Sequence, residues 1–434
     1  MPTKIFVGNC MTTQQTFKEA ILNKRMLICI FTGFTSGLPL FILYQLVPGW
    51  LRSEGVSLVE IGLFSLIGIP YVWKFIWSPL MDRYSFPMLG RRRSWMFATQ
   101  VLLLFSIAGF GFIDPTINIW SVAYLAAAVA FFSASQDIVL DAYRRELLQE
   151  HELGLGNSIH VQAYRLSGLV PGSLAFILAD HISWQSVFLI VAAFMLIGIL
   201  LTLCIKESKS EHLAPKTLHD AVVLPFRDFI SRKGFKSALQ ILIFLFLYKL
   251  GDSMATALQT PFFIDLGFTK TEIGVVAKTA SLIAMTIGLA VGGIVMIKLS
   301  INKALWLFGF VQIISILGFA ALAEIGHNTY ALAFAMGFEY LGVGLGTAAF
   351  TAFIARTTNP AFAATQFALF TALTALPRTF ANATTGLIVE QIGWTSFYFL
   401  CTFLAIPGML MLFKVAPWSE KVPFETKNKT EELI

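Results

Sequence analysis

Charged side chains lie within long apolar stretches of this sequence, where they could bind ions or exchange protons. Nine of them are candidates for such roles: Lys74, Asp137, Asp141, Arg165, Lys249, Asp252, Lys278, Glu339 and Arg378. Each would cost about 2.5 to 3.5 kcal/mol at the centre of a lipid-facing helix. Five are bases and four are acids, which suits mutual pairing. We therefore expect them to face one another or a wet cavity.

Three of the acids are candidates for proton exchange. Asp137, Asp141 and Arg144 follow a spacing of i, i+4 and i+7, so they share one helix face. Asp141 and Arg144 are expected to pair near the membrane interface, which leaves Asp137 deeper. Glu339 is a second deep carboxyl group. A carboxyl group in a low dielectric can take up a proton in one environment and release it in another. A static polar contact is an equal alternative for Asp137 and Glu339.

Basic residues in the apolar stretches predict an anionic substrate. Arg165 and Arg378 lie in corresponding helices of two similar halves, and guanidinium groups bind carboxylates through two hydrogen bonds. Lys249 and Asp252 lie three residues apart and can pair along one helix, either as a structural ion pair or beside a cavity. Nearby hydroxyl and amide groups could bind sugar or peptide groups: Tyr44, Gln45, Gln162, Tyr164 and Asn382.

A motif after the second apolar stretch predicts a gate. Residues 78–84 read Ser-Pro-Leu-Met-Asp-Arg-Tyr and residues 89–93 read Leu-Gly-Arg-Arg-Arg, which resembles a loop signature of the major facilitator superfamily. An acid at this helix end can contact the positive N-terminus of a neighbouring helix, and Asn359 with Pro360 predicts such an N-terminus. The predicted gating residues are Asp82, Arg83, Arg91 and Arg144. Membrane anchoring explains the arginine run equally well.

The elements that must position these residues are membrane helices. The chain has 434 residues, of which 56% are apolar and 13% are charged, which excludes an ordinary soluble protein. About 20 apolar residues cross a bilayer. Twelve spans are predicted, at 26–48, 58–80, 95–112, 118–143, 156–179, 185–204, 237–263, 272–296, 304–323, 330–354, 361–387 and 395–413. The predicted fold is an all-α polytopic membrane protein.

Charge outside the spans predicts the orientation. Residues 1–25 form an N-terminal segment, 26–204 a first bundle, 205–236 a basic linker that includes a candidate surface helix, 237–413 a second bundle and 414–434 a tail. With both termini in the cytoplasm, only Arg52 and Lys270 fall in loops on the opposite side. This asymmetry follows the positive-inside rule, so the net charge of +6 does not indicate nucleic-acid binding.

Internal repeats divide the chain into two halves. The sequence Gly-Val-Ser-Leu-Val-Glu-Ile-Gly at residues 55–62 recurs as Gly-Phe-Thr-Lys-Thr-Glu-Ile-Gly at residues 267–274. Likewise, Ile-Ser-Trp-Gln-Ser-Val-Phe at residues 182–188 recurs as Ile-Gly-Trp-Thr-Ser-Phe-Tyr at residues 392–398. Nearly equal offsets predict two six-helix halves related by an axis along the membrane normal, as in the major facilitator fold.

Several of these segments together resemble one family of the superfamily, the AmpG muropeptide permeases. They are residues 78–84, 89–95, 135–144, 164–170 and 346–350. The resemblance implies proton-driven import of anhydromuropeptides from the periplasm across the bacterial inner membrane. In this family the imported fragments feed peptidoglycan recycling and signal β-lactamase induction. Longer members of the family carry additional hydrophobic segments that this sequence lacks.

Other functions stay open at this point. A related carrier for another anionic solute such as acetyl-coenzyme A is one alternative, and a membrane receptor that binds without transport is another. An enzyme is not expected, because motifs such as His-Glu-x-x-His and Gly-x-Ser-x-Gly are missing. The four cysteines lack metal-ligand spacing, so neither a metal nor a cofactor is expected. The expected partners are an anionic glycopeptide, protons and membrane lipid, with the chain acting as a monomer.

Overall fold

Long apolar helices dominate the computed structural model. It describes residues 23–78, 81, 89–148, 152–207, 227, 230–231, 234–357, 375 and 379–419. Within these residues, nine helices are long and apolar enough to cross a membrane, and Leu58–Trp73 is a shorter apolar helix. Most of the predicted span at 361–387 and most of the linker lie outside the described residues, so the number of twelve spans stays a prediction. The predicted all-α membrane fold is confirmed.

The first bundle contains six predicted spans, several of which are built from consecutive helical segments. They are α2 (Lys24–Phe41), η1 (Ile42–Leu46) and α3 (Val47–Ser53); α4 (Leu58–Leu63), η2 (Phe64–Gly68), α5 (Ile69–Trp73) and η3 (Lys74–Ile76); α7 (Arg91–Gly109) and η4 (Phe110–Phe112); α8 (Ile119–Leu147); α9 (Leu153–Ser167), η6 (Val170–Leu174) and α10 (Ala175–Ala179); and α11 (Trp184–Ala193) with α12 (Met195–Cys204). The π-helical segment η6 has Pro171 near its start. Proline removes a backbone donor, which accounts for a local change of helix type.

The described part of the second bundle is also built from consecutive helical segments. Its described segments are α14 (Phe235–Tyr248), α15 (Leu250–Ala257) and α16 (Gln259–Asp265); α17 (Lys270–Glu272), η7 (Ile273–Ala277) and α18 (Lys278–Lys298); α19 (Ile301–Ile325); α20 (Thr329–Thr357); and α22 (Thr385–Val415). Within α22, Gly393 has φ 76° and ψ 168°, which interrupts the helix. Glycine tolerates this positive φ, so the chain can turn there between two predicted spans.

The first repeat found in the sequence forms two matching helix starts. Ser57 and Glu60 make a capping box at the start of α4, and Thr269 with Glu272 makes the same box at the start of α17. In each box the side chains satisfy backbone donors that have no partner within the helix. The repeat is therefore a local signal that begins the second helix of each bundle at the same position.

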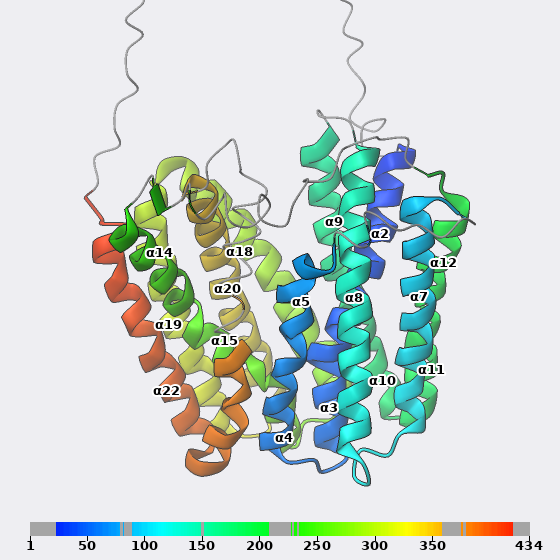
Figure 1. The fold of residues 1–434 in the computed structure, drawn as a ribbon. Coiled ribbons are helices and arrows are strands. Elements are labelled where there is room, and N and C mark those ends of the chain that lie inside the picture. The colour runs from blue at the N-terminus through cyan, green and yellow to red at the C-terminus, as the bar shows by residue number, and fades with distance from the viewer. Residues whose placement is uncertain are drawn as a thin grey trace, which may run out of the picture.

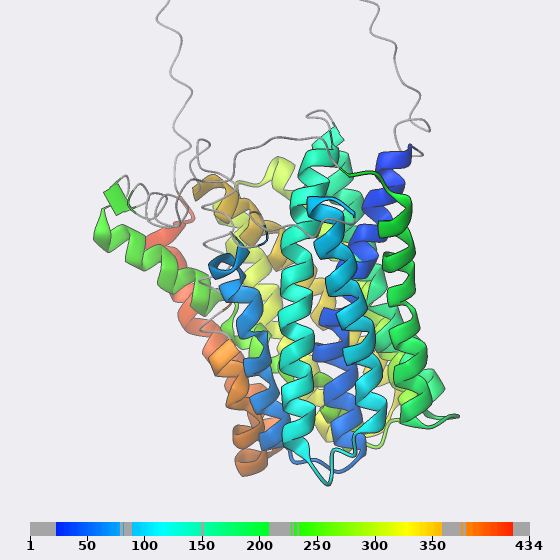
Figure 2. The same cartoon turned by 45° about the vertical axis from the view of Figure 1, so that its right-hand side comes forward.

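The two bundles stand side by side and meet most closely at one end (Figure 1). The more extensive contacts between bundles join α4 to α22, α3 to α16, α10 to α17 and η6 to η7. These segments lie at or near the end that holds Arg52 and Asp265, or, in the case of the long helix α22, begin there; we call it the joined end. The opposite end, where α2 begins at Lys24 and α22 ends at Val415, is called the distal end. Figure 2 shows the same arrangement from a second side.

Apolar side chains occupy both the interior and the outer surface. A large buried cluster includes Trp50, Phe110 and Phe188 in the first bundle and Phe262, Phe319 and Tyr398 in the second. On the outside, Phe105, Phe334 and Phe403 are each about two-thirds exposed. A soluble protein rarely exposes so many large apolar side chains, whereas lipid solvates them. The outer surface therefore suits a bilayer.

Candidate functional site

A cavity of about 520 Å³ lies between the two bundles. This volume falls within the range of small-molecule sites, about 300–1,000 Å³. Its described lining combines aromatic, amide, hydroxyl and charged side chains, among them Phe41, Tyr44, Gln45, Asp252, Ser253, Gln259, Lys278, Tyr340, Thr379 and Asn382. The lining comes from both bundles, so a bound molecule would contact both.

Four of the predicted binding residues line this cavity: Tyr44, Gln45, Asp252 and Asn382. The amide of Asn382 donates to the Ser253 hydroxyl at 3.1 Å, which joins the lining of α15 to the segment before α22. Gln162 is exposed, and Tyr164 packs its ring 5.5 Å from Phe41. Neither they nor Arg165 are among the described lining residues, and their binding roles stay predictions. Arg378 lies outside the described residues.

An acid–base cluster lies beside the cavity in the second bundle. The Lys249 ammonium is 3.3 Å from Asp252 Oδ2, so the predicted pairing is confirmed. Glu339 is buried, and its Oε2 accepts a hydrogen bond of 2.7 Å from the Ser315 hydroxyl. Glu339 also interacts with Asp252 across the bundle. Two carboxyl groups and one ammonium therefore share a small volume, and one proton would change the charge of the whole cluster.

A second carboxyl site lies in the first bundle. Asp137 Oδ1 accepts a hydrogen bond of 2.6 Å from the Ser36 hydroxyl, and its Oδ2 is 3.8 Å from the Lys74 ammonium. The three residues come from three different spans, which sequence spacing within one helix does not reveal. Asp141 instead pairs with Arg144 at 2.9 Å, as predicted. Asp137 is thus the acid whose contacts connect spans.

Lys278 is a lining residue that sequence reasoning did not assign to binding. It begins α18, and its ammonium donates to Gln45 Oε1 at 2.7 Å across the bundle boundary. The only sequence signal is a lysine in an apolar stretch, which Lys74 and Lys249 share. Periodicity does not show which of these lysines faces the cavity, because that depends on how the bundles pack.

An ion pair joins the bundles at the joined end. Arg52, which follows the first span, binds Asp265 at the end of α16. Asp265 also accepts a hydrogen bond of 3.0 Å from the indole of Trp394. Arg52 and Asp265 are 213 residues apart and lie near the ends of corresponding helices. The contact therefore links corresponding positions of the two halves.

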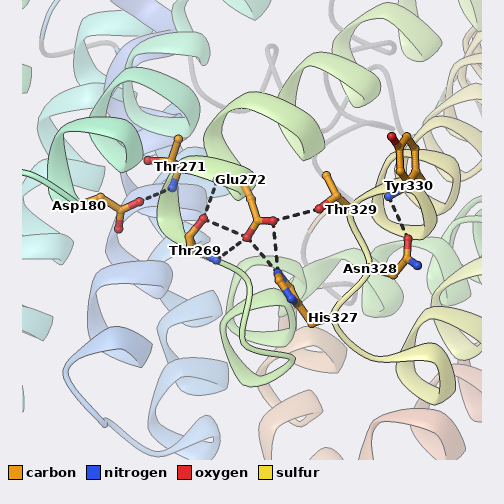
Figure 3. Close-up of polar contacts among 8 residues, drawn as sticks. All are labelled: Asp180, Thr269, Thr271, Glu272, His327, Asn328, Thr329 and Tyr330. Atoms are coloured by element: carbon orange, nitrogen blue, oxygen red, sulfur yellow. Dashed lines mark hydrogen bonds and ion pairs between the residues drawn. The ribbon is translucent and has the colours of Figure 1, made fainter.

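Two further contacts at the joined end are related by the same pseudo-symmetry. The backbone N–H of Thr271 donates to Asp180 Oδ2 at 2.6 Å (Figure 3), and that of Val59 donates to Glu390 Oε1 at 3.3 Å. Thr271 corresponds to Val59 in the first repeat, and Glu390 follows Asp180 by 210 residues. In each contact a carboxylate meets the positive N-terminus of a helix in the other bundle, which stabilises the contact.

Glu272 fixes the helix start that Asp180 contacts. Figure 3 shows its carboxylate between Thr269 on one side and His327 and Thr329 on the other. His327 Nε2 lies 3.0 Å from Glu272 Oε2, and the Thr329 hydroxyl donates to Oε1 at 3.0 Å. The start of α17 is thereby tied to the start of α20 within its own bundle, so it can present its N-terminus to the other bundle.

Close packing between backbones accompanies these polar contacts. A Cβ at Gly274 would lie 2.7 Å from the Ser173 carbonyl oxygen, and one at Gly62 would lie 3.0 Å from the backbone nitrogen of Gly386. Gly62 and Gly274 end the two copies of the first repeat. Small residues allow membrane helices to approach closely. The repeats therefore supply both the polar and the packing contacts of the joined end.

The predicted gate at the distal end is described only in part. The Arg91 guanidinium is 3.7 Å from Glu146, which also binds Arg92 at 3.0 Å. The backbone N–H groups of Arg92 and Arg93 donate to Glu207. These contacts stay within the first bundle and the beginning of the linker. The remaining gate residues, Asp82, Arg83, Asn359 and Pro360, lie outside the described residues, so the gate stays a prediction.

Two helical membrane bundles that enclose a polar cavity and join at one end have the construction of a membrane transporter. The family model described as Major Facilitator Superfamily matches residues 29–381. The anhydromuropeptide permease of Escherichia coli K12 is 44% identical over 390 residues, which cover 89% of this chain and 79% of that protein. An uncharacterized protein of Haemophilus influenzae is 48% identical over 96% of this chain and 99% of its own length.

A solved structure shares the fold at low sequence identity. The nucleoside transporter NupG, as its D323A mutant, superimposes with a TM-score of 0.74 at 12% identity, covering 90% of this chain and 99% of that one. This chain belongs to the AmpG family of the major facilitator superfamily.

Proposed function

We propose that this protein imports anhydromuropeptides from the periplasm to the cytoplasm by proton-coupled symport. The observation that carries the proposal is the cavity between the bundles, in a chain 44% identical to the Escherichia coli anhydromuropeptide permease. Its amide, hydroxyl and aromatic lining suits N-acetyl sugars, and its charged side chains suit a peptide stem. A binding site that both bundles share is what alternating access requires, because rocking the bundles then exposes it to either side.

The basic loops support the direction of transport. Basic residues concentrate toward the distal end, so the positive-inside rule puts this end in the cytoplasm and the joined end in the periplasm. In that orientation the structure is closed toward the periplasm. Arg52–Asp265 and the two carboxylate contacts to helix starts would then form the periplasmic gate, and substrate entry would require them to separate.

Two carboxyl sites are candidates for proton coupling. The cluster of Asp252, Glu339 and Lys249 borders the cavity, so proton uptake there would change the charge next to the substrate. Asp137 connects three spans of the first bundle through Ser36 and Lys74. We favour the Glu339 cluster as the coupling site because it combines burial with contact to a lining residue.

Uptake of labelled anhydromuropeptide into proteoliposomes tests this function. An imposed inward proton gradient should drive accumulation above the external concentration, and a protonophore should abolish it. Exchange of internal for external substrate should continue without a gradient. Equal uptake with and without the gradient would reject proton coupling.

The same preparation separates the alternatives. Acetyl-coenzyme A added in excess should leave muropeptide uptake unchanged if the proposal is right. Binding of muropeptide without uptake or exchange would identify a receptor instead of a carrier. Protein that neither binds nor transports muropeptide, yet transports another anionic solute, would reject the substrate assignment while leaving the transporter class intact.

A further inference from the structure

Lys278 occupies a bridging position in the cavity between the two bundles. Its ammonium donates to Gln45 Oε1 at 2.7 Å and lies 5.3 Å from the centroid of the Phe41 ring. Gln45 and Phe41 belong to the first span of the other bundle. Both partners are neutral, and an aromatic face attracts a cation only moderately. The positive charge of Lys278 is therefore held by weak partners.

The other two lysines of the apolar stretches have carboxylate partners. Lys74 is 3.8 Å from Asp137, and Lys249 is 3.3 Å from Asp252. Among the described residues, no carboxylate lies within 4.0 Å of the Lys278 ammonium. A cation within the membrane is costly unless it is paired or borders a wet cavity. Lys278 borders the cavity and has no carboxylate partner among the described residues. A bound ligand can therefore supply the anion that pairs with its ammonium.

The charges of the cavity wall favour an anion at this point. Asp252 and Lys278 are the charged residues of the described lining, and Asp252 is already paired with Lys249. On the side of Gly172, space is filled: a Cβ there would lie 2.3 Å from Gln45 Oε1 and 3.0 Å from Lys278 Nζ. No room is left between Gly172 and this pair, and the cavity that Lys278 lines gives an anion a way to reach the ammonium.

We propose that Lys278 binds a carboxylate of the transported molecule, which replaces the Gln45 oxygen as the partner of the ammonium. This assignment rests on the proposed function and names the group that would recognise the charged part of the substrate. Because Gln45 and Lys278 lie on different bundles, a carboxylate at this point would sit at the boundary that moves during alternating access.

The test compares a muropeptide with free stem carboxylates and the same muropeptide with those carboxylates converted to carboxamides. We expect the wild-type protein to bind the carboxylate form more tightly. Lys278→Met should weaken that binding about 10- to 100-fold, the range of a lost charged hydrogen bond, and weaken binding of the carboxamide form much less, because an amide oxygen is a neutral acceptor. Lys278→Arg should retain part of the preference. Lys303→Met, which removes a lysine near Trp418 far from the cavity lining, should behave as wild type.

A second variant keeps the lysine and supplies an internal anion. Gln45→Glu places a carboxylate where Lys278 now finds an amide oxygen, so it should compete with the carboxylate ligand and weaken its binding more than that of the carboxamide ligand. This variant decides the proposal if Lys278→Met does not fold. Equal weakening of both ligand forms in Lys278→Met, or unchanged carboxylate binding in Gln45→Glu, would overturn it.

A small probe separates this inference from the proposed function. N-acetyl-L-alanyl-D-glutamate and its diamide can be compared by thermal stabilisation of the purified protein. If wild-type protein does not transport muropeptide, the proposed function fails. Stabilisation by the dicarboxylate alone, lost in Lys278→Met, would still support Lys278 as a carboxylate site. The absence of any difference between the two probes in wild-type protein would refute it.

Discussion

Two carboxyl groups within the spans, the half-buried Asp137 and the buried Glu339, differ in what a proton would do to their surroundings. Asp137 contacts Ser36 and Lys74, which belong to two other spans, so it links three spans of the first bundle. Glu339 accepts a hydrogen bond from Ser315 and neighbours Asp252 in the cavity wall. Protonation of the Glu339 cluster would therefore change the charge that a substrate meets, whereas protonation of Asp137 would first loosen the packing of its own bundle.

Glu339→Gln should uncouple transport from the proton gradient. Glutamine preserves the shape of the side chain and can still accept a hydrogen bond from Ser315, so we expect the protein to fold and to exchange substrate. Accumulation driven by the gradient should fall at least about tenfold, which corresponds to about 1.4 kcal/mol. Counterflow and gradient-driven uptake in proteoliposomes measure the two activities separately.

The control for this variant is Asp114→Asn, because Asp114 is an exposed acid that bonds within its own loop. It should leave both activities unchanged. If Glu339→Gln retains full gradient-driven accumulation and Asp137→Asn loses it, the coupling site is Asp137 instead. Loss of exchange together with accumulation in Glu339→Gln would assign Glu339 to substrate binding or to structure.

At the scale of elements, the internal repeats turn out to be the contact surfaces of the two bundles. The first repeat begins α4 and α17. In each copy a backbone N–H group donates a hydrogen bond to a carboxylate of the other bundle. The acids, Asp180 and Glu390, stand just before the two copies of the second repeat. Each half thus supplies one donor and one acceptor of the same kind. Duplication of one six-helix unit produces such a pair of matching contacts without further sequence change.

Asp180→Asn and Glu390→Gln should each favour separation of the joined end. A carboxylate at a helix N-terminus contributes about 0.3 to 1 kcal/mol, so each variant should shift the ratio of open to closed molecules about twofold to fivefold. The double variant should show the sum of both energies. Ile117 and Tyr330 are exposed positions on different bundles. Spin labels attached there report the distance between the bundles at the joined end by electron paramagnetic resonance.

A matched control exists at the same end of the molecule. Glu324 binds the Thr395 hydroxyl at 2.7 Å within its own bundle, so Glu324→Gln should leave the distance distribution unchanged. A shift in the control as large as that in Asp180→Asn would show that the cross-bundle contacts do not hold the joined end. An unchanged distribution in the double variant would have the same meaning.

At the scale of the whole molecule, the distribution of basic residues predicts which end faces the cytoplasm. Single cysteines at Ile117 and Tyr330, in a background without the native cysteines, should react with a membrane-impermeant maleimide added to the periplasmic side. A cysteine at Lys303, near the distal end, should react only after the membrane is disrupted. The reverse pattern of labelling would invert the proposed direction of transport.

The sequence by itself predicted the all-α membrane fold and most of the helix positions, because hydrophobic length and capping residues act locally. It also predicted the Lys249–Asp252 and Asp141–Arg144 pairs, since residues three apart lie on one helix face. The repeats indicated two similar halves. Family resemblance added the class of substrate, which no spacing within the chain specifies.

Tertiary structure decided which of the polar side chains meet. Asp137 finds Ser36 and Lys74, Lys278 finds Gln45, and Arg52 finds Asp265 through the packing of helices far apart in sequence. These contacts depend on how each helix is rotated and tilted against its neighbours. Glycines and bulky side chains distributed over the whole chain together set the rotation and tilt of each helix. No local sequence pattern therefore predicts which polar side chains meet.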